Sequence, residues 1–156
     1  MSQSVPFPSM RRLSLLLLLV LVAACGGGDD EPAELSRSEY TKQANAICVD
    51  VEKKLALLGG FENFKELSRE MLEGQEALQK SADDLAALRP PVALRANHQK
   101  LVDLQEETAD LAGQMSIAAG ENDQVGMQTQ AERAEQLTVS ANEVSRKLGV
   151  EECVAG

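Results

Sequence analysis

Apolar residues recur every three or four positions through most of the chain after residue 35, and this spacing constrains the fold more than any other feature. It places apolar side chains on one face of an amphipathic helix. Four stretches carry the pattern, at Tyr40, Ala44, Ile47, Cys48, Val51, Leu55 and Leu58; at Phe64, Leu67, Met71, Leu78, Leu85 and Leu88; at Leu94, Leu101, Leu104, Thr108, Leu111, Met115 and Ala118; and at Met127, Ala131, Ala134, Leu137, Ala141, Val144 and Leu148. No segment shows the alternation of a half-buried strand. The sequence therefore predicts an all-α protein.

Capping and helix-breaking residues set the bounds of the first two helices. Ser36 followed by Glu39 has the spacing of a capping box. Two glycines beginning at Gly59 end the first helix after Leu58. The second helix is expected to begin near Asn63 and to end before Pro90, because the residue before a proline is pushed out of the helical region.

The third helix is expected from about Pro91 to Ala119, and the fourth from the turn "GEND", residues 120–123, to a closing Gly149. Short connections between helices favour antiparallel neighbours. The sequence therefore predicts an antiparallel up-down four-helix bundle. Counting residues from the connections places Leu78 level with Leu104 and Leu104 level with Leu137, and it puts Phe64, Met115 and Met127 in one layer near the far end. We also expect a dry, aliphatic core.

The first 24 residues have a different character. Arg11 and Arg12 precede a short apolar run that ends in small residues before Cys25, which is the pattern of a secretory signal peptide. The segment Val22 to Cys25 resembles the lipobox of bacterial lipoproteins, in which the cysteine is acylated and becomes the new N-terminus. The alternative is an ordinary signal peptide cleaved elsewhere, with Cys25 a free thiol. Ser14 favours the general secretory route over the twin-arginine route.

The lipobox interpretation divides the chain into three parts: a signal peptide over residues 1–24, a flexible membrane tether over 25–35 and a bundle domain over 36–156. More than one acyl chain, such as diacylglycerol with palmitate, is needed for stable anchoring. The mature chain then has 13 basic and 25 acidic residues, a net charge of −12. Such acidity argues against nucleic-acid binding and against lying flat on anionic lipid, so the bilayer is contacted through Cys25.

An acylated Cys25 leaves Cys48 and Cys153 as the two remaining cysteines of an exported chain. Export to an oxidising compartment predicts a disulfide between them, and two reduced thiols are the alternative. The fourth helix continues past the level of Cys48 before the chain reaches Cys153. A disulfide therefore predicts that the first helix is displaced along the bundle toward the C-terminal end of the fourth helix. It also predicts that residues 59–63 span the remaining length of the bundle and that residues 149–153 fold back toward Cys48.

Three short segments carry a family resemblance: "EYTKQANAIC" (39–48), "LRPPVAL" (88–94) and "LGVEEC" (148–153). In this order along the chain they resemble a group of actinobacterial envelope lipoproteins with helical-bundle domains. The resemblance covers roughly residues 36 to 153. It implies an envelope location and a helical fold, and it implies no activity.

The residues offer little chemistry. His98 is the one histidine and is expected at the surface or half-buried, because the Glu-x-x-His spacing of carboxylate-bridged metal sites is missing. Met71, Met115 and Met127 fall on apolar stripes, where methionine fills gaps in the core. No Gly-x-Ser-x-Gly elbow is present, and the acidic turn offers too few oxygens for calcium. We expect no catalytic residue, no metal and no cofactor.

Two functional classes follow. The first is a non-enzymatic interaction or structural module of the cell envelope, anchored on the extracytoplasmic side, with an envelope protein as partner. The alternative is a carrier of a small ligand or metal, using a gap between helices near His98 or at a notch beside Gly74. A carrier should have a pocket lined by His98 or by convergent carboxylates. An interaction module should have a filled core and an exposed apolar patch larger than about a few hundred Å².

Overall fold

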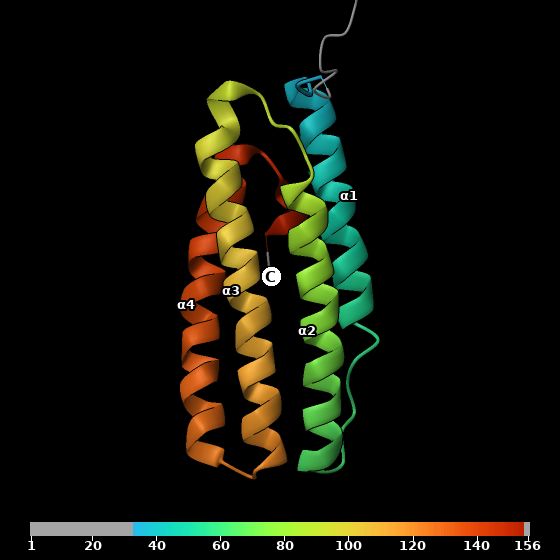
Figure 1. Ribbon diagram of the computed structural model, residues 1–156, viewed down its shortest axis with the longest axis vertical. Helices are drawn as coiled ribbons and strands as arrows, with labels where there is room; N and C mark the ends of the chain where they lie inside the picture. The colour runs from blue at the N-terminus through green and yellow to red at the C-terminus, as the bar shows by residue number, and fades with distance from the viewer. Residues whose placement is uncertain (1–32, 155–156) are drawn as a thin grey trace, which may run out of the picture. The chain divides into compact units, whose positions relative to one another are not determined.

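The computed structural model describes residues 33–154, and this part of the chain is all-helical, as predicted (Figure 1). Its helices are α1 (Arg37–Leu55), α2 (Phe64–Ala86), α3 (Arg95–Gly120) and α4 (Gln124–Leu148), with two short 3₁₀ helices, η1 (Val92–Leu94) and η2 (Glu151–Cys153). The described residues contain no strand. None of their helices has the length and apolar character needed to cross a bilayer. The predicted signal peptide and Cys25 lie outside the described residues.

Polar side chains cap the helices where the sequence indicates. Ser36 and Glu39 form the predicted capping box: the Ser36 hydroxyl accepts from the Glu39 N–H at 3.3 Å, and the Ser36 N–H donates to the Glu39 carboxylate at 3.0 Å. The Asn63 side chain accepts from the Glu66 N–H at 3.0 Å at the start of α2. These bonds satisfy backbone donors that have no partner inside a helix.

Two helix ends differ from the prediction. Helix α1 ends at Leu55, so Leu58 lies in the turn that follows it rather than on the helix. Helix α3 begins only after η1, at Arg95 rather than Pro91. The prolines contribute to the second difference, because Pro91 pushes Pro90 out of the helical region and is itself extended, with ψ of 144°.

The contacts between α2 and α3 correct the predicted register. The Ser68 and Ser116 hydroxyls lie 3.2 Å apart, and Gln105 donates to the Ser81 hydroxyl at 3.5 Å. Ser68 near the start of α2 therefore lies beside Ser116 near the end of α3, and Ser81 near the end of α2 lies beside Gln105 in the first half of α3. Because Ser81 lies opposite Gln105, Leu78 lies level with Thr108, about one turn from the predicted Leu104. The predicted register of α2 against α3 is wrong because the chain rises through η1 before α3 begins.

The predicted register between α3 and α4 agrees with the contacts. Arg133 forms an ion pair with Glu107, which is the spacing expected if Leu104 lies level with Leu137. The predicted far layer is displaced, however. Phe64 lines a surface hollow together with Ala119, Gly120 and Asn122, so it lies one to two turns along α3 from the predicted Met115.

Helix α1 covers only one end of the other three helices, and the chain from Ala56 to Asn63 runs along the remaining length (Figure 1). The core gathers at the end that α1 covers. Its buried members are Tyr40, Ala44, Leu85, Leu94, Leu101, Val102, Leu104, Leu111, Leu137, Val144, Leu148 and Val150. Residues toward the α3–α4 turn, such as Met115 and Met127, are only partly buried.

The predicted disulfide is present. Cys48 and Cys153 are bonded, with 5.1 Å between their Cα atoms and 105 residues between them in sequence. Gly149 reverses the chain in a left-handed conformation, with φ of 75°. The following residues form η2 and return to α1, as expected. The alternative of two reduced thiols is wrong for this structure.

Candidate functional site

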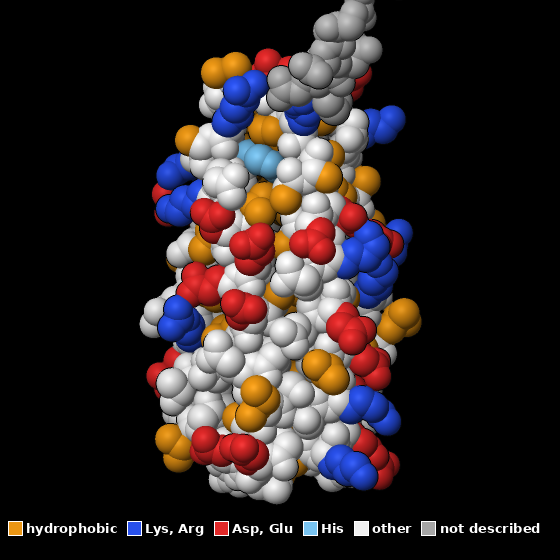
Figure 2. Space-filling model, in the orientation of Figure 1, with side chains coloured by type: hydrophobic (Ala, Val, Ile, Leu, Met, Phe, Trp, Pro, Cys, Tyr) orange, Lys and Arg blue, Asp and Glu red, His pale blue; other side chains and the backbone are white. Residues whose placement is uncertain are grey.

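The one histidine lies in the core rather than at the surface. His98, near the start of α3, is 6% exposed, so the expectation of a surface or half-buried residue is wrong. Its Nδ1 lies 3.1 Å from the hydroxyl of Tyr40 on α1, and the two rings meet edge to face with centroids 5.5 Å apart. Only part of the His98 ring reaches the surface in Figure 2. The core is therefore not purely aliphatic.

Burial sets the charge of both groups. It lowers the pKa of His98 below its ordinary 6.5, and it raises the pKa of Tyr40 to about 12. Both side chains are therefore neutral near pH 7. A neutral imidazole with its proton on Nε2 can accept a hydrogen bond at Nδ1 from the Tyr40 hydroxyl, which keeps its proton. This pair gives α1 a specific polar contact with α3.

The notch beside Gly74 is filled. A Cβ placed on Gly74 would lie 3.4 Å from Cδ1 of Leu58 and 3.6 Å from Cδ2 of Leu55. These are ordinary van der Waals distances, so the end of α1 and its following turn pack directly onto α2. Both places suggested for a carrier, beside His98 and at Gly74, hold side chains of the protein itself.

Met71, Met115 and Met127 are each partly buried on the apolar faces of their helices. Within residues 33–154 no three His, Cys, Asp or Glu side chains converge in a way that could hold a metal ion.

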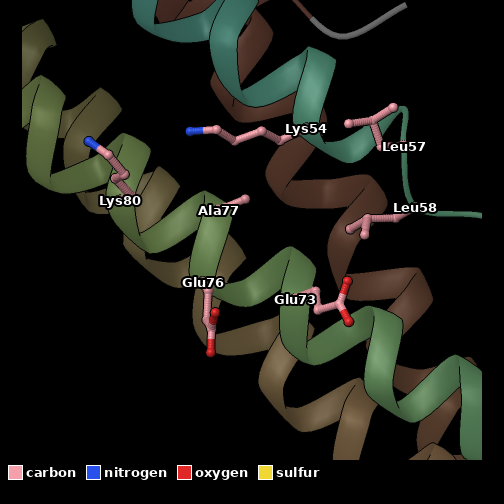
Figure 3. A pocket seen from close by; sticks show the side chains of 7 residues that line it. All are labelled: Lys54, Leu57, Leu58, Glu73, Glu76, Ala77 and Lys80. Atoms are coloured by element: carbon pink, nitrogen blue, oxygen red, sulfur yellow. The ribbon is translucent and has the colours of Figure 1, made fainter.

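A shallow hollow lies where α1 ends against α2 (Figure 3). It has a volume of about 420 Å³ and is lined by Lys54, Leu57, Leu58, Glu73, Glu76, Ala77 and Lys80. Leu57 is 85% exposed there. Lys54 and Lys80 pair with acidic residues on their own helices, at 2.7 Å to Asp50 and 2.6 Å to Asp84. We call this feature the α1–α2 hollow.

A second hollow, the distal hollow, lies near the α3–α4 turn. It has a volume of about 570 Å³ and is lined by Phe61, Glu62, Asn63, Phe64, Lys65, Ala119, Gly120 and Asn122. Phe61 is 52% exposed, and Asn122 has a positive φ of 57°. Neither hollow was predicted from the sequence. Leu57 and Phe61 lie on either side of Gly59 and Gly60 in the α1–α2 connection, and apolar residues next to two glycines that interrupt a helical pattern were the available signal.

The side chains of the face seen in Figure 2 are mainly charged and polar, with acidic groups spread over its middle. Separate apolar side chains appear between them. Comparisons with protein-family models, with curated proteins and with solved structures found no significant match. The functional argument therefore depends on the sequence and on this geometry.

Proposed function

We propose that this protein is a non-enzymatic interaction module, anchored to the cell membrane through acylated Cys25 and facing the extracytoplasmic side. Its helical domain would bind another envelope protein. The resemblance of three segments to actinobacterial envelope lipoproteins supports membership of that group. An acidic chain of this kind is not suited to nucleic acid.

One observation carries the choice of an interaction module over a carrier. The two interior places where a ligand could have been held are filled, by Tyr40 beside His98 and by Leu55 and Leu58 over Gly74. Among the described residues, two of the seven exposed large apolar side chains, Leu57 and Phe61, line open surface hollows. A filled interior with apolar side chains in open hollows favours contact with another macromolecule over enclosure of a small ligand.

The disulfide supports the proposed compartment. Disulfides persist in oxidising surroundings such as the outside of the cell membrane, and they are rare in the cytosol. The bond between Cys48 and Cys153 therefore agrees with an exported chain. The lipobox-like segment that ends at Cys25 supports the anchor.

The anchor is tested by mass spectrometry of the native N-terminal peptide. We expect a peptide that begins at an acylated Cys25. We also expect the Cys25→Ala variant to leave the membrane fraction. An unmodified peptide that spans Ala24 and Cys25 would refute lipidation.

The interaction surface is tested by photo-crosslinking in intact cells. A photoreactive residue at Leu57, in the α1–α2 hollow, should yield a discrete adduct with a membrane or envelope protein. Val139 is the matched control, since it is an exposed apolar residue on α4 at 69% exposure. Equal adducts from both positions, or none from Leu57, would argue against this surface.

We further propose that the four helices follow an antiparallel up-down order. Contacts between Ser68 and Ser116 support opposite directions for α2 and α3, and the ion pair of Glu107 with Arg133 supports the same for α3 and α4. The Leu35 N–H donates to the Arg89 carbonyl at 2.9 Å, which brings the start of α1 to the end of α2.

A further inference from the structure

Helix α1 is attached to the rest of the domain differently from the other helices. The most extensive packing joins α2 to α3 and α3 to α4, whereas α1 packs mainly on α2 and η2. Helices α1 and α4 each contact η2 more than they contact each other. The segment from Gly149 to Cys153, here called the C-terminal wedge, therefore occupies the place where α1 and α4 would otherwise meet.

The wedge reaches α1 through a small number of contacts. Val150 is fully buried, and the Glu152 N–H donates to the Asn45 side-chain oxygen on α1 at 3.2 Å. The Cys153 sulfur lies 3.8 Å from the Ala44 carbonyl oxygen. The bond from Cys153 to Cys48 is the one covalent contact between the wedge and α1 among the described residues.

The apolar stripe of α1 is narrow. Its buried residues are Tyr40, Ala44, Cys48 and Val51, so the stripe has one large side chain, a valine and two small residues. Helix α3 has nine buried residues, including Leu101, Leu104 and Leu111. Burial of less apolar surface gives α1 less hydrophobic stabilisation than α3. The extensive packing of α3 with α2 and α4 does not involve α1, whose buried polar contact with α3 is the one between Tyr40 and His98.

We propose that the Cys48–Cys153 bond is a redox latch. In the oxidised protein the wedge holds α1 against the domain. Reduction by a dithiol, such as a Cys-x-x-Cys oxidoreductase, frees the wedge and allows α1 to open while α2, α3 and α4 stay packed. Opening uncovers the apolar surface around Tyr40, Val144 and Leu148. This inference does not depend on the anchor or on the proposed partner.

The electrons for reduction of the Cys48–Cys153 bond come from the dithiol, by thiol–disulfide exchange. One thiolate of the dithiol attacks the Cys153 sulfur, which is the better target because Cys153 is only partly buried whereas Cys48 is 8% exposed. This forms a mixed disulfide and expels the Cys48 thiolate, which takes up a proton. The second thiol of the dithiol then displaces Cys153. Two electrons and two protons pass to the protein, and the dithiol becomes a disulfide.

Hydrogen exchange monitored by mass spectrometry tests the latch in the purified full-length protein. The oxidised protein is compared with protein reduced by dithiothreitol and alkylated. On reduction we expect exchange in residues 37–55 and 149–154 to accelerate by about tenfold or more, while residues 101–111 change by less than about twofold. Reoxidation before alkylation should restore slow exchange.

Two variants complete the experiment. Cys153→Ser should reproduce the exchange pattern of reduced protein without any reductant. Asn45→Ala keeps the disulfide and removes only the contact to the Glu152 N–H, so its exchange should stay within about twofold of the oxidised protein. An equal acceleration of exchange in all four helices would show that the disulfide stabilises the whole domain rather than α1 alone, and it would overturn the latch. Unchanged exchange in α1 after complete reduction would overturn it too.

Discussion

The contact between Tyr40 and His98 is the most specific polar interaction in the core. The pair joins α1 to α3 across 58 residues of sequence, and no buried side-chain nitrogen or oxygen atom within residues 33–154 lacks a hydrogen-bond partner. A buried polar group that loses its partner keeps the cost of leaving water. Each member of the pair therefore requires the other. Substitutions at this pair test its contribution directly.

Tyr40→Phe should lower the free energy of unfolding by about 1–3 kcal/mol. The phenyl ring keeps the shape of the side chain but leaves Nδ1 of His98 without its partner. Urea unfolding followed by circular dichroism measures the change. A loss below about 0.5 kcal/mol would mean that water replaces the hydroxyl at no cost.

His98 should make stability depend on pH. Burial lowers the pKa of His98 in the folded state, so below about pH 6.5 the unfolded chain binds more protons than the folded chain. This contribution is complete above the unfolded pKa and is lost as the pH falls through the folded pKa. We expect the free energy of unfolding to decrease between about pH 7 and pH 5.5.

The His98→Gln variant is the control for this dependence. Glutamine offers an acceptor to the Tyr40 hydroxyl and does not titrate. Its stability should be flat over the same interval, above the range in which the lowered pKa values of Glu39, Asp50 and Glu143 produce acid destabilisation. Equal slopes for wild type and variant would exclude His98 as the source.

At the scale of the elements, two glycines have opposite roles. Gly74 lies inside α2 with neighbours at ordinary contact distance, whereas Gly149 ends α4 with a φ of 75°. An alanine gains from the helical conformation at the first position and is strained at the second. The distances around Gly74 allow a methyl group there.

Gly74→Ala should stabilise the protein by about 0.5–1 kcal/mol, because it removes backbone entropy from the unfolded chain and creates no clash. Thermal unfolding at neutral pH measures the shift. A lower melting temperature would show that Leu58 cannot move away from the added methyl group.

Gly149→Ala should destabilise by about 1–2 kcal/mol, since the left-handed conformation crowds a Cβ against the backbone. A Cβ there meets no other atom within 4 Å, so strain of the backbone is the expected cause. Gly149→Asn, which tolerates this conformation better, should recover part of the loss.

At the scale of the whole molecule, the core is concentrated at one end. Helix α1 and the C-terminal wedge cover that end, and α2, α3 and α4 continue past it toward the distal hollow. The α1–α2 hollow lies where the coverage by α1 ends, and the exposed Phe61 lines the distal hollow beyond it. Because α1 is short, it covers the core at one end and leaves exposed the apolar surface that we propose for binding.

Leu104→Ala tests the core as a unit, and it should cost about 2–5 kcal/mol through lost burial and a remaining cavity. Leu104 belongs to the buried cluster. Leu72→Ala is the matched control, because Leu72 on α2 is exposed and its loss should change stability by less than about 0.5 kcal/mol. Equal effects of both substitutions in chemical denaturation would contradict the described core.

The sequence by itself determined the four helices, the capping box at Ser36 and the bond between Cys48 and Cys153. Helix periodicity and capping are local, because they involve residues within a few positions of each other. The cysteine pairing followed from elimination, once Cys25 was assigned to the lipid. Local rules also identified Gly149 as the point of chain reversal.

Only the tertiary structure decided the level of α2 against α3, the burial of His98 and the two surface hollows. Each depends on contacts between residues far apart in sequence. Because the chain rises through η1 before α3 begins, Leu78 lies level with Thr108 rather than with Leu104. Tyr40 contacts His98 because α1 lies at one end of the domain. A periodic stripe states which face of a helix is apolar, but it does not state how far the helix slides along its neighbour before the side chains interlock.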